Sequence, residues 1–295
     1  MAAVASATPR RSIKETLYHF KIVKRAAIIL SVLFFGFTML FPFFWMGLTS
    51  IRTGNDLFKI AKTPFAVHGV TLQHYYLLLT ETKFIRWMFN SLFVASTASV
   101  MALIVGIIAA YSFGRLRYRG GAAIALLVFS TYLIPPVLLF IPLNVVVNTL
   151  KLSNNLWSLI LTYQTFMVPF IAWMLAGYFK SIPAELVDAA RIDGASRIKA
   201  MLVIDLPLIL PGVISVFFFA FTLAWNEYLY AFTFIRSSSK LPVAVGVVNA
   251  LQVGDVYFWG QLMAGAILGS VPVVIIYSFL MDYYLAGLTA GAVKG

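Results

Sequence analysis

The chain alternates long apolar runs with short polar segments, and this pattern predicts helices that cross a membrane. The first run, Ala26–Ile51, carries no charge over 26 residues, and about 20 apolar residues are enough to span a bilayer. Five more charge-poor runs follow, and their continuity excludes the alternating strands of a closed β-barrel. We therefore predict an all-α membrane protein with six transmembrane helices, at about residues 26–51, 89–113, 122–146, 156–178, 208–234 and 260–282.

The polar segment that precedes the first run, residues 1–25, is basic. A cleaved signal peptide has an apolar region of about 7–15 residues, so the longer run that follows predicts a retained helix. We expect residues 1–25 to form a cytoplasmic N-terminal segment and residues 26–295 to form one membrane domain.

The distribution of lysine and arginine predicts the orientation of the chain. If the N-terminus lies inside, the inside segments hold 14 basic residues, with Lys180 counted at the start of the 181–205 segment, and the outside segments hold 8. Cytoplasmic segments carry the excess of basic residues. Both termini and the 181–205 segment are therefore predicted to be cytoplasmic.

Composition removes several classes of function. The chain is 61% hydrophobic and 11% charged, which is too apolar for a soluble domain. It has no cysteine, and its three histidines lie outside the apolar runs without ligand spacing. We predict no catalytic residue and no metal site. We also predict no nucleic-acid partner, because the net charge of +12 is distributed over the segments between the spans and the surroundings are membrane lipid.

The segment Ser181–Gly212 predicts two helices joined by a tight turn. Pro183 suits the first turn of a helix, and Gly194 can end that helix in the left-handed conformation. Ser196 can cap a second helix, which Pro207 closes or bends. Small residues on the first helix would let a partner dock closely, although an interfacial helix without a partner also fits these features.

This segment resembles the EAA loop of bacterial ABC importer permeases. Asp188–Ala190 is followed by Gly194 after three residues, and Ile204–Pro207 begins after nine more. The family pattern is Glu-Ala-Ala-x3-Gly-x9-Ile-x-Leu-Pro. Asp188 in place of glutamate is the only departure, and it keeps the charge.

Other segments resemble the carbohydrate-importer branch of that family, in particular the maltose-type second membrane subunit. The similarity covers nearly the whole chain. The matching segments are Asn90–Ala95, Ala110–Arg115, Ile141–Leu143, Trp225–Tyr228 and Gly287–Gly295.

The resemblance implies a type I ABC importer permease fold in a bacterial inner membrane, with an EAA loop at residues 181–207. It implies import of a sugar or oligosaccharide by alternating access. The implied partners are two ABC ATPase subunits, a second homologous permease and a periplasmic or lipid-anchored solute-binding protein. The implied ATPase-docking residues on the coupling helix are Glu185, Asp188, Ala189, Ala190, Arg191, Asp193 and Gly194.

The chain has no nucleotide-binding loop of its own. A Walker A loop needs Gly-Lys followed by Ser or Thr, and no Gly-Lys pair occurs in the sequence. We therefore expect no cofactor in this chain and no enzymatic activity, with ATP and Mg²⁺ bound by a partner ATPase.

Polar groups inside apolar spans are costly and indicate candidate sites. Amide groups beside aromatic rings suit sugars, whereas each amide can also serve as an interhelical hydrogen bond worth about 0.6–2 kcal/mol. The acid among them can be a gate residue or an anchor bonded to neighbouring backbone. The substrate-path candidates are Asn144, Asn148, Gln164, Asn226 and Glu227.

Other functions remain open at this stage. Within the family, the substrate could be a glycerol-phosphate or a polyol. A stand-alone secondary transporter should show inverted repeats and several ionisable groups in the spans, and neither is evident. A membrane enzyme should show a cluster of catalytic groups, and one glutamate does not make a cluster.

Overall fold

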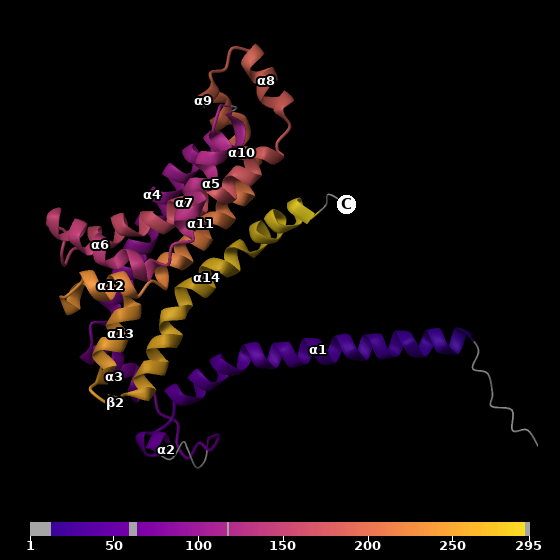
Figure 1. The fold of residues 1–295 in the computed structure, drawn as a ribbon. Helices are drawn as coiled ribbons and strands as arrows, with labels where there is room; N and C mark the ends of the chain where they lie inside the picture. Colours follow the sequence, from indigo (N-terminus) through magenta and orange to yellow (C-terminus); the bar gives the residue numbers. More distant parts are fainter. Residues whose placement is uncertain (1–12, 59–63, 117, 293–295) are drawn as a thin grey trace, which may run out of the picture.

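A computed structural model describes residues 13–58, 64–116 and 118–292, and these residues are almost entirely helical (Figure 1). The long helices are α1 (Ile13–Ser50), α4 (Phe84–Arg115), α7 (Leu156–Ser181) and α14 (Trp259–Ala292). The medium-length helices are α5 (Gly121–Tyr132), α6 (Pro136–Thr149) and α11 (Leu210–Trp225). Short helices are α2 (Gly54–Phe58), α3 (Gln73–Glu81), α8 (Ala184–Ile192), α9 (Arg197–Ala200), α10 (Leu206–Leu208), α12 (Leu229–Phe234) and α13 (Val243–Leu251). The π-helical turn η1 (Met201–Asp205), the 3-10 turn η2 (Ser238–Lys240) and a hairpin of β1 (Gln252–Val253) with β2 (Val256–Tyr257) complete the described chain.

Four of the described helices, α1, α4, α7 and α14, are long and apolar enough to cross a membrane. Two bent pairs bring the number to six if each pair crosses once. The predicted single helix at 122–146 is broken, because α5 and α6 meet at 92°. Pro135 and Pro136 lie at this break and cannot continue the helical hydrogen-bond ladder.

The predicted span at 208–234 is also interrupted. The segment Arg197–Leu208 meets α11 at 80°, beside Pro207 and Pro211. At its other end α11 stops at Trp225, and α12 begins at Leu229, after three intervening residues. The C-terminal part of this span is therefore a short separate helix rather than a continuation of α11.

The core of the described chain lies where α4 packs against α7. Small residues recur on the buried face of α4, at Ala95, Ala98, Ala102, Gly106 and Ala110. A Cβ atom on Gly106 would overlap Ile171 Cγ2 of α7. Small residues let helix backbones approach closely within a membrane, so this stripe explains why α4 and α7 are in close contact along their length.

The connecting segments gather at two opposite ends of the helices (Figure 1). Helix α8 lies at one end, and α2, α3, α13 and the hairpin lie at the other. At the hairpin end, Asn154 Nδ2 donates to Ser237 Oγ at 2.7 Å, and Trp87 Nε1 donates to the Ser238 carbonyl at 2.6 Å. The segments predicted to share the outer side therefore do share one end of the molecule.

The connection from α1 to α3 is anchored by an ionic contact. The carboxylate of Asp56 accepts a hydrogen bond from His68 N at 2.9 Å and lies 2.8 Å from His68 Nδ1. These contacts hold the pKa of Asp56 below its ordinary value of 3.8, because hydrogen bonds to a carboxylate favour its charged form. Residues 1–12 of the predicted N-terminal segment, and residues 293–295 of the tail, lie outside the described residues.

Candidate functional site

Helix α8 has the ends that its sequence predicts. Pro183 precedes the first helical residue with φ −54°. At the other end Gly194 has φ +87°, a conformation that residues with a Cβ rarely adopt. Gly194 N donates to the Arg191 carbonyl at 3.1 Å and Ala195 N donates to the Ala190 carbonyl at 2.9 Å. This pair of bonds is the Schellman motif, and it turns the chain sharply towards α9.

The second short helix, α9, also begins as predicted. The hydroxyl of Ser196 accepts a hydrogen bond from Lys199 N at 3.2 Å, which satisfies one of the free donors at a helix start. Helix α9 continues directly into η1, a π-helical turn. Such turns are frequent at functional sites, and this one places Asp205 at the point where the loop returns to the helices.

The outer face of α8 is open. Helix α8 has no buried residue, and it projects beyond the ends of α4, α7 and α11 (Figure 1). Large apolar side chains are uncovered here, with Ile192 86% exposed and Ile198 of α9 68% exposed. Exposed apolar side chains beside charged ones are typical of surfaces that bind a protein or a membrane.

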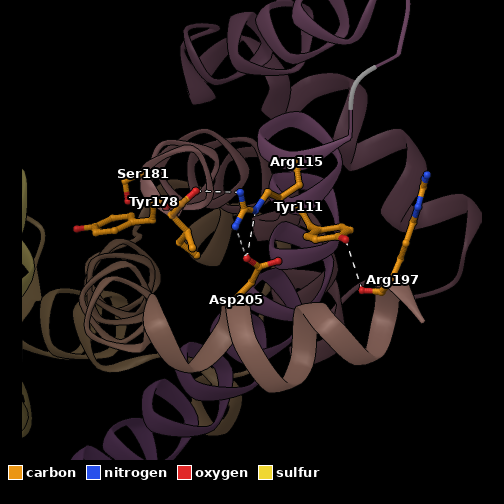
Figure 2. Close-up of polar contacts among 7 residues, drawn as sticks. Tyr111, Arg115, Tyr178, Ser181, Arg197 and Asp205 are labelled. Atoms are coloured by element: carbon orange, nitrogen blue, oxygen red, sulfur yellow. Dashed lines mark hydrogen bonds and ion pairs between the residues drawn. The ribbon is translucent and has the colours of Figure 1, made fainter. Parts of the chain in front are cut away.

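A buried ion pair ties the end of this loop to α4 (Figure 2). Arg115, the last residue of α4, donates from Nε and Nη2 to Asp205 Oδ1, at 3.1 and 2.6 Å. Its Nη1 donates to the Ile182 carbonyl, directly after α7, at 2.9 Å. The Asp205 side chain is fully buried and that of Arg115 is 11% exposed, so one guanidinium joins α4, the end of α7 and the end of the α8 loop.

A second contact joins α4 to the start of α9. Tyr111 lies one helical turn before Arg115, and its hydroxyl donates to the Arg197 carbonyl at 3.4 Å (Figure 2). The Tyr111 ring also packs edge-on against Phe179 of α7. Side chains of α4 therefore hold both the start of α9 and the end of η1.

The predicted docking residues share α8 and the turn that follows it. Glu185, Asp188, Ala189, Arg191, Asp193 and Gly194 are exposed, and Ala190 is half-buried. Within the described chain, the four charged side chains of this set make no hydrogen bond or ion pair. The structure places them together, and their role in docking stays a prediction.

The substrate-path candidates do not converge on one site. Asn148 donates to Asn144 across one turn of α6 at 2.8 Å. Gln164 donates to the carbonyls of Ile160 and Ala98, at 2.8 and 3.2 Å, between α7 and α4. Asn226 lines a mostly apolar hollow of about 600 Å³ between α11, α13 and α14. Their role in a substrate path is still a prediction.

Glu227 lies at the break between α11 and α12. Its carboxylate accepts hydrogen bonds from Tyr230 N at 2.8 Å and Ala231 N at 3.1 Å. It also accepts a hydrogen bond from the hydroxyl of Tyr163 in α7 at 2.9 Å. A carboxylate at this position satisfies free donors at the start of α12. All of these contacts lie within the chain and hold the broken span together.

Comparison with protein families decides the identity of the chain. Residues 102–289 match the model described as "Binding-protein-dependent transport system inner membrane component". The chain belongs to this family of ABC transporter permeases. The matched range contains α8, Gly194 and both members of the Arg115–Asp205 pair.

Relatives of this permease cover most of its length. The inner membrane ABC transporter permease protein YcjP of Escherichia coli is 36% identical over 258 residues, which are 87% of this chain and 91% of that protein. The trehalose/maltose transport system permease protein MalG of Thermococcus litoralis is 30% identical over 277 residues, 93% of this chain and 99% of that protein.

The fold of the permease matches a solved structure. A bacterial ABC transporter involved in the import of the acidic polysaccharide alginate contains a chain with TM-score 0.75 and 21% identity. The match covers 94% of this permease and all of that chain. The all-helical importer permease fold predicted from the sequence is thereby confirmed.

Sequence reasoning missed the residues that hold the permease loop in place. The sequence places Arg115 at the end of the Ala110–Arg115 segment and Asp205 within Ile204–Pro207, and neither motif indicates that the two side chains pair. The two are 90 positions apart, so no local pattern relates them. The one signal in the sequence is that Asp205 directly precedes an apolar run. A buried charge without a partner is costly, so this position indicates that Asp205 is paired.

Proposed function

We propose that this permease is the membrane-spanning subunit of an ATP-driven, binding-protein-dependent importer of a sugar or oligosaccharide. The observation that carries the proposal is the exposed helix α8, tied back to α4 and α7 by the buried Arg115–Asp205 pair. A helix that is open on its outer face and fixed at its base can receive a motion and pass it to the spans.

The proposed partners supply what the chain does not contain. Two ABC ATPase subunits would bind ATP and Mg²⁺ and dock on α8, and a second permease would complete the path. A periplasmic or lipid-anchored binding protein would deliver the solute to the hairpin end. The chain itself would act without a cofactor and without catalysis. Its family membership and the alginate importer of similar fold support this assembly.

The proposed substrate class rests on the relatives. MalG of Thermococcus litoralis is named for trehalose and maltose, and the structural neighbour belongs to an alginate importer. A neutral or acidic saccharide therefore fits better than a polyol or a glycerol-phosphate, which an uptake assay would distinguish. Alternating access would follow from closure of the ATPase pair against α8.

The orientation of the permease can be tested by labelling, because the chain has no cysteine of its own. Ile192→Cys places one thiol on α8, and Asp255→Cys places one in the hairpin turn; both positions are exposed. With the permease expressed without the ATPase subunits that would cover α8, we expect a membrane-impermeant maleimide to label Asp255→Cys in intact spheroplasts and Ile192→Cys only in inverted vesicles. The reverse labelling pattern would contradict the proposed cytoplasmic position of α8.

The requirement for the partner subunits in ATP hydrolysis and uptake can be tested by reconstitution. We expect vesicles with the complete assembly, ATP and a maltooligosaccharide-loaded binding protein to accumulate labelled sugar. Vesicles with this subunit alone should neither hydrolyse ATP nor accumulate sugar, because no nucleotide-binding loop is present. ATP hydrolysis or concentrative uptake by the purified subunit alone would refute the proposal. Uptake of glycerol-phosphate without sugar would change only the substrate class.

A further inference from the structure

A hollow of about 830 Å³ opens where α4 and α7 end and α5 begins. Its lining is apolar in its deeper part and basic at its rim. The rim residues are Arg119 and Lys180, with Tyr118 between α4 and α5. The apolar lining residues include Phe113, Ala122, Ala125, Leu126 and Trp173.

The two rim cations are free to bind an anion. Arg119 and Lys180 are exposed, and neither side chain has a hydrogen bond or an ion pair to any residue that the structure describes. A second hollow, under α8, shares Tyr118 and Lys180 with the first. It adds the guanidinium groups of Arg191 and Arg197, against the single acid Asp188. The rim is therefore strongly positive.

The apolar part extends from this rim towards the middle of the spans. Trp173 precedes Lys180 by seven residues on α7, which places it about 10 Å deeper at 1.5 Å per residue. Its indole stacks on Phe129 of α5 with 4.2 Å between ring centroids, yet Trp173 is 44% exposed and Leu126 is 58% exposed. A phosphate at the rim would leave a hydrocarbon chain lying along these side chains.

We propose that this groove binds an anionic phospholipid. Its phosphate would lie between Arg119 and Lys180, and one acyl chain would lie against Trp173 and Leu126. Basic pockets between membrane helices on the cytoplasmic side suit acidic lipid headgroups, and the aromatic residues Tyr118 and Trp173 are typical of the membrane interface. The paired cations explain selection for an anionic headgroup, and the apolar wall explains why a free phosphate would not suffice.

The bound lipid would lie beside the docking helix. Lys180 lines both hollows, and Arg191 of α8 lines the second. A lipid phosphate on Lys180 would therefore be close enough to influence the α8 loop electrostatically. This places a lipid-sensitive element next to the moving part of the permease, on the same end as the Arg115–Asp205 pair.

The test uses the purified full assembly in nanodiscs made from equal amounts of phosphatidylglycerol and phosphatidylethanolamine. After detergent extraction, native mass spectrometry counts the lipids that remain bound. We expect the wild type to retain phosphatidylglycerol preferentially and Arg119→Gln/Lys180→Gln to lose it. Each cation near a membrane surface contributes about fivefold to anionic-lipid binding, hence roughly 25-fold for the pair.

Two further variants make the outcome specific. Ala122→Trp fills the exposed apolar groove while leaving both cations, so it should also release phosphatidylglycerol. Lys83→Gln/Arg86→Gln removes two exposed cations at the opposite end of α4 and should change nothing. Equal retention in Arg119→Gln/Lys180→Gln and wild type would overturn the proposal. Displacement of the lipid by excess inorganic phosphate, or loss of a protein subunit with lipid retention unchanged, would overturn it as well.

Discussion

Replacing Gly194 with valine is expected to leave the permease inserted in the membrane but to release the ATPase subunits during purification and abolish uptake. Gly194 adopts φ +87°, and a Cβ there would meet no atom of the described residues within 4 Å, its two neighbours in the chain aside. The space beside it is open for a partner. Overpacking a close contact costs about 1–3 kcal/mol, which weakens binding roughly 5- to 150-fold.

A second source of loss is the backbone itself, because a residue with a Cβ pays about 1–2 kcal/mol in the left-handed conformation. Gly194→Asn separates the two effects, since asparagine tolerates this conformation but still adds a side chain. Gly254→Val is the matched control. Gly254 also has a left-handed φ, +59°, with open space around it, but it lies in the hairpin at the far end.

The measurement is the ratio of ATPase to permease after affinity purification, together with sugar uptake. We expect Gly194→Val and Gly194→Asn to lower the ratio and Gly254→Val to keep it. If asparagine restores the ratio fully, the requirement at Gly194 is conformational. If valine leaves both ratio and uptake at the wild-type level, α8 is not the docking helix.

Removing the carboxylate of Asp205 is expected to separate ATP hydrolysis from transport. In Asp205→Ala the Arg115 guanidinium stays largely buried without its partner, and breaking a buried ion pair in this way costs about 3–5 kcal/mol. The α8 surface remains intact, so the ATPase subunits should still bind. A movement of α8 would no longer be transmitted to α4 through this ion pair, so the uptake per ATP hydrolysed should fall.

The double variant Arg115→Met/Asp205→Leu distinguishes stability from transmission. Apolar replacement of a buried ion pair is often neutral for stability, so the thermal midpoint in detergent should recover towards that of the wild type. The control Asp255→Ala removes an exposed acid of the hairpin turn and should not change the midpoint. An unchanged midpoint and unchanged coupling in Asp205→Ala would show that the Arg115–Asp205 pair does not transmit motion.

Local signals explain which parts of this protein could be predicted from the sequence. Gly194 and Ser196 have the predicted caps because both motifs depend on a few neighbouring residues. The apolar runs predicted the helices because each run is long enough to cross a bilayer. Pro135 and Pro136 account for the break between α5 and α6, but the 92° angle there depends on how α6 packs against α7 and α12.

Interactions between distant segments could not be predicted in the same way. The Arg115–Asp205 pair joins the end of α4 to the end of η1, and its geometry exists only after both elements are packed. For the same reason, the amides of Asn144 and Gln164 could not be assigned to a solute path. The structure gives each a hydrogen-bond partner within the chain.

The close packing of α4 on α7 has a mechanical consequence. Helix α4 contains 32 residues, which corresponds to a length of about 48 Å. Because the small-residue stripe packs it closely on α7, we expect the two helices to move together as one rigid body, here called the beam. The Arg115–Asp205 pair is attached at one tip of this beam, and Trp87, bonded to the Ser238 carbonyl, lies near the other. If the beam pivots about its middle, a push at one membrane face reappears at the opposite face with the same amplitude and the reverse direction.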